Sequence, residues 1–189
     1  MTLLIIGLAL FLGSHSIQIF IPGVRAALIG RMGANGWKGL YALLALAGFV
    51  LLIMGYGQAR GAPALWTPPA GAVHATAGLV LIGFILNVAA YWPGNHIKAI
   101  VKDPMVLGVG AWALGHLLAK GTAPAIALFG GFLIWAALDY VSLRMRPAGP
   151  AGPAPRLVNT IGVVVVGAIL FAVFAFYLHG LLIGVKPFG

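Results

Sequence analysis

The chain has 189 residues, of which 62% are hydrophobic and only 7% are charged, whereas soluble domains carry about 25% charged residues. Eleven Lys and Arg stand against two acidic residues, Asp103 and Asp139, so catalysis by paired carboxylates is not expected. The absence of cysteine excludes disulfides, thiolate metal sites, covalent haem attachment and cysteine nucleophiles.

Apolar stretches of roughly 20 residues, the length needed to cross a bilayer as a helix, recur along the chain. We expect six membrane spans, at residues 2–20, 38–56, 72–92, 105–119, 122–141 and 157–179. Pro22-Gly23 closes the first span, and Pro104 begins the short fourth one, where a missing backbone N–H does no harm. The predicted fold class is therefore all-α, a polytopic transmembrane helical bundle of about six helices.

Two segments between the spans are predicted to be non-helical. Gly33, Asn35 and Gly36 are typical of a turn after the first span. The proline-rich sequence RMRPAGPAGPAPR, which ends at Arg156, suits neither helix nor strand. We accordingly predict a five-helix membrane domain over 1–142, a Pro/Gly/Ala-rich cytoplasmic linker over 143–156, and an appended transmembrane helix with a short tail over 157–189.

The distribution of basic residues predicts the orientation in the membrane. Placing the first loop in the cytoplasm puts eight basic residues inside and three outside, which follows the positive-inside rule. The eight are Arg25, Arg31, Lys38, Lys98, Lys102, Arg144, Arg146 and Arg156, and the three are Arg60, Lys120 and Lys186. This arrangement predicts a membrane protein with both termini outside the cytoplasm, and it explains the basic excess by contact with anionic lipid rather than nucleic acid.

Histidines are the main candidates for chemistry, because polar side chains at membrane depth are unfavourable unless partnered and tend to mark sites. His15 falls inside the first span and His116 inside the fourth. His74 and His179 fall at the outer ends of the third and sixth spans, and His96 falls in a cytoplasmic loop. A structural role, with a neutral imidazole bonded to a backbone carbonyl, remains the alternative to a proton relay or a metal site.

Among metal sites, b-type haem suits these histidines better than zinc. A catalytic zinc site takes three protein ligands, often with short spacings such as HExxH, and no such pattern occurs. Haem needs axial ligands and a flat slot. Gly13, beside His15, and Gly108 and Gly115, before His116, are small enough to leave room for one. No GxxxxGK[ST] or GxGxxG pattern indicates a nucleotide.

Long stretches of the chain resemble the NnrU family of bacterial membrane proteins. They include LGSHSIQIFIPGVR, GWKGLYALLALAGFVLLIMGYGQAR, LWTPP, YWPGNHIKAIVKDPMVLGVGAWALGHLLAKG, FGGFLIWAALDY and the ending HGLLIGVKPFG. The resemblance implies an association with denitrification, with nitrite or nitric oxide reductase components as partners, but no settled biochemical activity.

The same sequence is similar to the plant 15-cis-zeta-carotene isomerases, which are membrane haem b enzymes. Their two ligand motifs match His15 in SHSIQIF and His116 in WALGHLL. This chain has Ala113 where the plant motif has an alternative cysteine ligand, and Asp103 where it has a histidine. The similarity therefore implies haem b on His15 and His116, without the ligand exchange of the plant enzymes.

The predicted topology leaves the ligand pair open. His15 and His116 lie about four residues to opposite sides of their helix centres, which at ~1.5 Å per residue separates them by ~12 Å of depth. His74, on the outer side like His116, is therefore kept as a reserve ligand, with His179 as a further alternative.

The candidate functions are a haem protein of denitrification, a haem-dependent isomerase acting on an apolar polyene, and a cofactor-free assembly factor. Whether the chain is an enzyme stays open.

Overall fold

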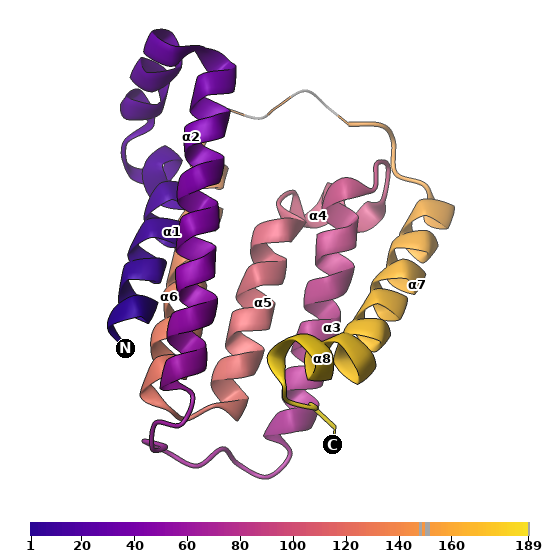
Figure 1. Cartoon of the computed structure of the whole chain (residues 1–189). Helices are drawn as coiled ribbons and strands as arrows, with labels where there is room; N and C mark the ends of the chain where they lie inside the picture. The colour runs from indigo at the N-terminus through magenta and orange to yellow at the C-terminus, as the bar shows by residue number, and fades with distance from the viewer. Residues whose placement is uncertain (148, 150–151, 189) are drawn as a thin grey trace. The chain divides into compact units, whose positions relative to one another are not determined.

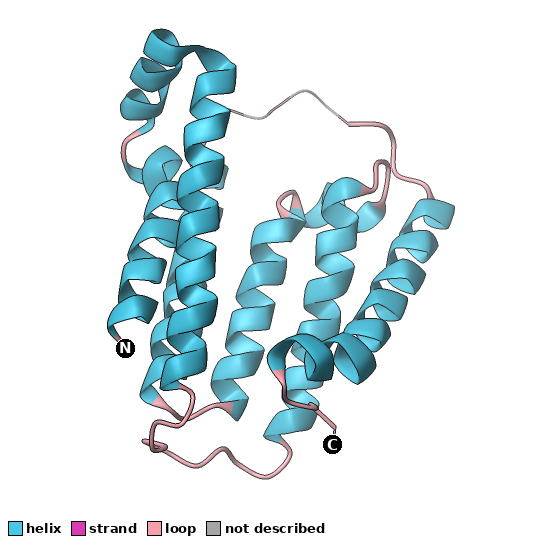
Figure 2. Ribbon diagram, in the orientation of Figure 1, coloured by secondary structure: helices cyan, strands magenta, loops and turns pink. Residues whose placement is uncertain are grey.

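The computed structural model describes residues 1–147, 149 and 152–188, and all regular elements in this part of the chain are helices (Figures 1 and 2). They are α1 (Thr2–Phe20), α2 (Pro22–Ala59), α3 (Ala72–Tyr91), α4 (His96–Val101), α5 (Pro104–Ala119), α6 (Ala123–Met145), α7 (Leu157–Val173), the π-helical segment η1 (Phe174–Leu178) and α8 (His179–Ile183). The predicted all-α class is confirmed.

Within the described residues, five helical stretches are long and apolar enough to cross a membrane: α1, α2, α3, α6 and the continuous run Leu157–Ile183. The predicted fourth span, α5, is apolar but has only 16 residues. At ~1.5 Å per residue it measures about 24 Å, less than the ~30 Å hydrocarbon core. These helices indicate a multi-pass membrane protein. Its predicted orientation stays a prediction.

The loops differ from the prediction in two places. Asn35 and Gly36 are helical, because α2 already begins at Pro22 and continues past them. Only Gly33 interrupts this helix, with a φ of 75° that an L-residue rarely adopts. The segment around His96, expected to be a loop, forms the short helix α4, whose first turn is capped by the Asn95 side chain accepting from the Lys98 backbone N–H.

The chain divides into two compact units. Unit 1 contains Met1–Thr67 and Lys120–Ser142, and unit 2 contains Pro68–Ala119 and Leu143–Gly189. The predicted three-part division stays a prediction, and its linker 143–156 lies partly outside the described residues. Within unit 2, α7 packs along α3.

Glycines bring helix backbones together in each unit, as is common between membrane helices. In unit 1, a Cβ at Gly48 of α2 would lie 2.6 Å from the backbone nitrogen of Phe11 in α1, and a Cβ at Gly7 would lie 2.6 Å from that of Leu52. In unit 2, Gly83 of α3 faces Gly108 of α5, where a Cβ would lie 3.0 Å from the opposite carbonyl oxygen.

A polar cluster fixes the start of α7 to the loop that follows α3. The buried Asn95 donates to the carbonyls of Ala89 and Trp92. Asn159 of α7 donates to the carbonyls of Pro93 and Gly94 at 3.2 and 3.0 Å. These bonds satisfy backbone carbonyls that would otherwise lie unpaired at a helix end.

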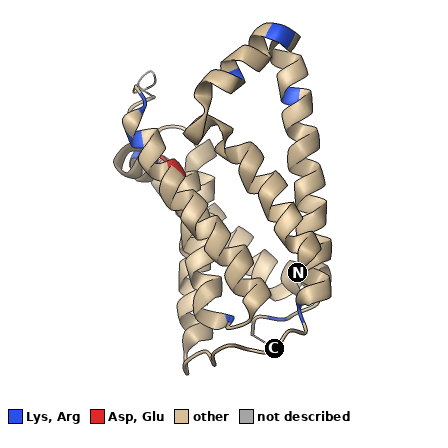
Figure 3. Cartoon of the chain, turned by 90° about the vertical axis from the view of Figure 1, so that its left-hand side faces the viewer, with Lys and Arg blue, Asp and Glu red and all other residues tan. Residues whose placement is uncertain are grey.

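Charged side chains are scarce along the middle of the long helices (Figure 3). Within unit 2, Asp103 forms an ion pair with Arg144.

Candidate functional site

His15 has a defined orientation set by its own helix. Its Nδ1 lies 2.7 Å from the carbonyl oxygen of Phe11, one turn earlier, and its ring stacks on the Phe11 ring at a centroid distance of 4.3 Å. Because a carbonyl oxygen only accepts, the neutral imidazole carries its proton on Nδ1 and keeps a lone pair on Nε2. A backbone bond of this kind is how metal-ligating histidines are commonly oriented.

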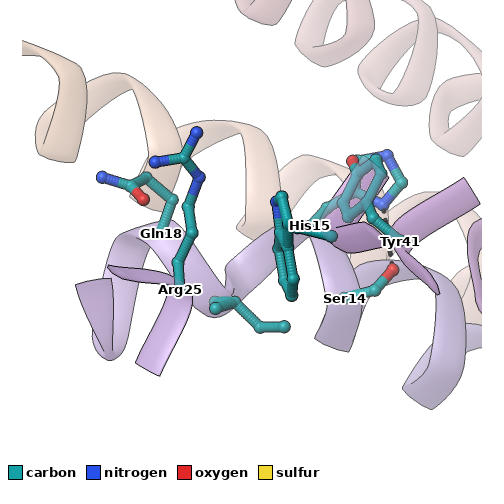
Figure 4. A pocket seen from close by; sticks show the side chains of 7 residues that line it. Ser14, His15, Gln18, Arg25 and Tyr41 are labelled. Atoms are coloured by element: carbon teal, nitrogen blue, oxygen red, sulfur yellow. Dashed lines mark hydrogen bonds between the residues drawn. The ribbon is translucent and has the colours of Figure 1, made fainter. Parts of the chain in front are cut away.

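A cavity of about 280 Å³ in unit 1 adjoins this imidazole (Figure 4). Its lining comes entirely from α1 and α2, and consists of Ser14, His15, Ile17, Gln18, Arg25, Trp37 and Tyr41. The volume is just below the range of about 300–1,000 Å³ typical of ligand pockets. Arg25 is the only formally charged side chain in this lining.

The break in α2 at Gly33 accounts for the mixture of groups in the cavity. Arg25 precedes the break, whereas Trp37 and Tyr41 follow it, and all three line the same space. The buried indole of Trp37 packs near the Tyr41 ring, and the Tyr41 ring centroid lies 5.2 Å from that of His15. A glycine that permits a positive φ therefore brings a cation and two aromatic rings to one imidazole.

Trp135 of α6 adds an aromatic ring on another side of His15. The two rings meet edge to face, with centroids 6.0 Å apart. The Nε1 atom of Trp135 is buried and has no hydrogen-bond acceptor among the described residues. A buried donor without an acceptor is unfavourable by about 1–3 kcal/mol, so a bound group that accepts from it would be stabilised.

His116 repeats the local arrangement of His15 in unit 2. Its Nδ1 lies 2.8 Å from the carbonyl oxygen of Trp112, one turn earlier in α5, and its ring lies against the Trp112 indole at 5.3 Å between centroids. The same tautomer argument places the lone pair of the neutral ring on Nε2. His15 and His116 belong to separate units, and their pairing on one iron stays a prediction.

The other three histidines differ in setting. His74 is exposed in the first turn of α3, and its role as reserve ligand stays a prediction. His96 is exposed, with Nδ1 2.9 Å from the Thr160 hydroxyl. His179 follows the π-helical segment, packs edge to face with Phe174, and bonds the Val185 carbonyl through Nδ1 at 2.5 Å.

The expected glycine slot beside His116 is not what the structure shows. A Cβ at Gly108 would lie 2.7 Å from Asn87 Nδ2, and one at Gly115 would lie 3.2 Å from Leu79 Cβ, so both glycines pack against α3. Gly13, beside His15, does have open space around its Cα. The sequence could not show which glycines pack against a neighbouring helix and which face open space, because both kinds occur among the same apolar residues.

Several residues of the His15 site were not recognised from sequence. No site role was assigned to Trp37, Tyr41 or Trp135 from sequence. The spacing from Trp37 to Tyr41 places both on one face of α2, which is a usable signal once the kink at Gly33 is known. Within the described residues, no three His, Cys, Asp or Glu side chains gather closely enough to hold a metal ion.

Comparison with known proteins identifies the family but supplies no characterised counterpart. The family model described as NnrU protein matches residues 3–187, nearly the whole chain. No curated protein matches significantly, and neither does any solved structure. The chain, with its apolar helices and its oriented intramembrane histidines, belongs to the NnrU family.

Proposed function

We propose that this protein binds haem b within the bacterial inner membrane, with His15 as an axial ligand, and serves the membrane part of denitrification. The observation that carries the proposal is the Nδ1 bond of His15 to Phe11, which leaves a lone pair on Nε2 beside a cavity. Neutral imidazole is a good ligand for haem iron. The role in denitrification rests on membership of the NnrU family.

The residues around His15 suit a haem in their chemistry. Arg25 offers the guanidinium that would pair with a propionate. Trp37 and Tyr41 provide aromatic walls. A bound haem would supply one-electron chemistry or the binding of a small gas such as nitric oxide. The chain's own side chains would orient the imidazole and exclude water.

His116 is the proposed second ligand, with His74 in reserve. The support for His116 is its carbonyl bond to Trp112, which orients the ring as Phe11 orients His15. Two histidine ligands that both stay bound would suit electron transfer. An exchangeable second ligand would instead suit gas sensing, or the isomerisation of an apolar polyene. The proposed topology has both termini in the periplasm.

Visible absorption spectroscopy of the detergent-purified protein tests the haem proposal. We expect a Soret band that shifts on reduction with dithionite in the parent protein and in a His96→Ala control, because His96 is exposed and bonded to Thr160. The His15→Gly variant should lose or change that band, and added imidazole should restore it by filling the ligand position. Spectra of His116→Ala and His74→Ala decide the second ligand.

A colourless protein from cells well supplied with haem would overturn the proposal and favour a cofactor-free assembly factor. Retention of the parent spectrum in His15→Gly would refute His15 as a ligand. The denitrification role is tested separately, by nitrite and nitric oxide consumption in a deletion strain that carries either the parent gene or the His15→Gly allele.

A further inference from the structure

A second cavity, of about 450 Å³, lies on unit 2, and its lining contains no histidine. Phe84, Asn87, Val88 and Tyr91 have the i, i+3, i+4, i+7 spacing of one face of α3. Trp92, which follows the helix, and Leu170 of α7 complete the lining. The volume lies inside the range of ligand-binding pockets. Since α3 and the α7 run are both long and apolar enough to be membrane spans, the cavity suits an apolar chain from the bilayer.

The polar groups of this cavity are few and lie toward the α4 end of α3. The Asn87 side chain donates through Nδ2 to the Gly83 carbonyl at 2.9 Å, which uses one of its two amide hydrogens. Tyr91 is 79% exposed, and its hydroxyl donates to the Met105 sulfur at 3.4 Å, so its oxygen can still accept. These groups can therefore meet the polar part of an amphiphile whose chain lies deeper, beside Phe84.

Two basic residues stand at the same end. The ammonium of Lys98 donates to the carbonyl of Ala90 at 2.7 Å, and Ala90 is the residue that precedes Tyr91 in α3. The backbone N–H of Arg156 donates to the Gly94 carbonyl at 2.9 Å. This bond holds the start of α7 against the loop that follows Trp92. Among the described residues neither side chain forms an ion pair, and the carboxylate of unit 2, Asp103, pairs with Arg144.

We propose that this cavity binds one anionic phospholipid. An acyl chain lies along Phe84, Val88 and Leu170, and the phosphate lies at Lys98 and Arg156. Charge complementarity favours an anionic lipid over a zwitterionic one, because the lining contains no carboxylate and the Lys98 ammonium lies at the Ala90 carbonyl, at the same end of α3 as Tyr91 and Trp92. Trp92 lies between the two parts, at the depth where indole rings favour the membrane interface. The site does not depend on whether the protein binds haem.

Fluorescence quenching by brominated lipids tests the site, because Trp92 is part of its lining. The protein is reconstituted into vesicles of phosphatidylcholine with increasing amounts of phosphatidylglycerol, brominated on the acyl chains of one lipid or the other. The signal of Trp92 is the difference between the parent protein and a Trp92→Phe variant. We expect brominated phosphatidylglycerol to quench this signal at lower mole fractions than brominated phosphatidylcholine.

Matched variants separate the contribution of the basic residues to lipid binding from the contribution of the cavity. Each basic residue near an anionic lipid surface contributes about 1 kcal/mol, which corresponds to about fivefold in affinity. Lys98→Gln/Arg156→Gln should therefore lose most of the preference for phosphatidylglycerol, whereas Lys120→Gln/Lys186→Gln, with the same change of charge, should keep it. Leu170→Phe should reduce quenching by both lipids, because it fills the acyl position without altering charge.

Two results would overturn the proposal. One is equal quenching of Trp92 by the two brominated lipids in the parent protein. The other is an unchanged phosphatidylglycerol preference in Lys98→Gln/Arg156→Gln. If the double variant does not fold, Leu170→Phe decides the matter, because unchanged quenching in that variant would exclude the cavity as the binding position.

Discussion

The close approach of α1 and α2 at Gly48 predicts a large effect for a single methyl group. A Cβ at this position would lie 2.6 Å from the nitrogen and 2.9 Å from the Cα of Phe11. Both atoms belong to the backbone and cannot rotate away, so α1 must move by about 0.8 Å to reach an ordinary contact of 3.4 Å. Overpacking of this kind costs about 1–3 kcal/mol. The displaced residue also supplies the carbonyl that orients His15.

Gly57→Ala is the matched control for Gly48→Ala. Gly57 lies on the same helix, and nothing stands within 4 Å of its Cβ position. Both variants gain helix propensity, by about 1 kcal/mol, so their difference isolates packing. We expect Gly48→Ala to unfold at a lower SDS mole fraction than Gly57→Ala in a titration followed by far-UV circular dichroism. Coincident unfolding curves would refute the packing argument.

Two further predictions concern the ends of helices. Asn95→Ala should lower the free energy of unfolding by about 2–4 kcal/mol in the same titration, because it removes an N-cap and leaves two buried carbonyls unpaired; a loss below about 0.5 kcal/mol would show that water replaces the amide. Gly33→Ala should cost at least about 1 kcal/mol because its φ is 75°. Gly30→Ala, in open space on the same helix, should not lower stability, and equal losses in these two variants would contradict the strain argument.

Local sequence determined the helices and much of the orientation of the histidines. The apolar length of each span predicted α1, α3 and α5 to within one residue, because burial in lipid depends on a contiguous run of side chains. The spacing of an aromatic residue four positions before His15 and His116 is also a local property. It lets each imidazole lie against that ring, stacked for His15 and tilted for His116, and bond the same residue's carbonyl.

The use of each helix face was decided only by the tertiary structure. A membrane helix is apolar on every side, so its sequence does not mark which face meets protein and which meets lipid. For that reason Gly108 was expected to open a cofactor slot but packs against α3, and Trp37, to which no site role was assigned from sequence, lines the His15 cavity. Trp135 is remote from His15 in sequence, and only the packing of α6 in unit 1 brings the two rings together.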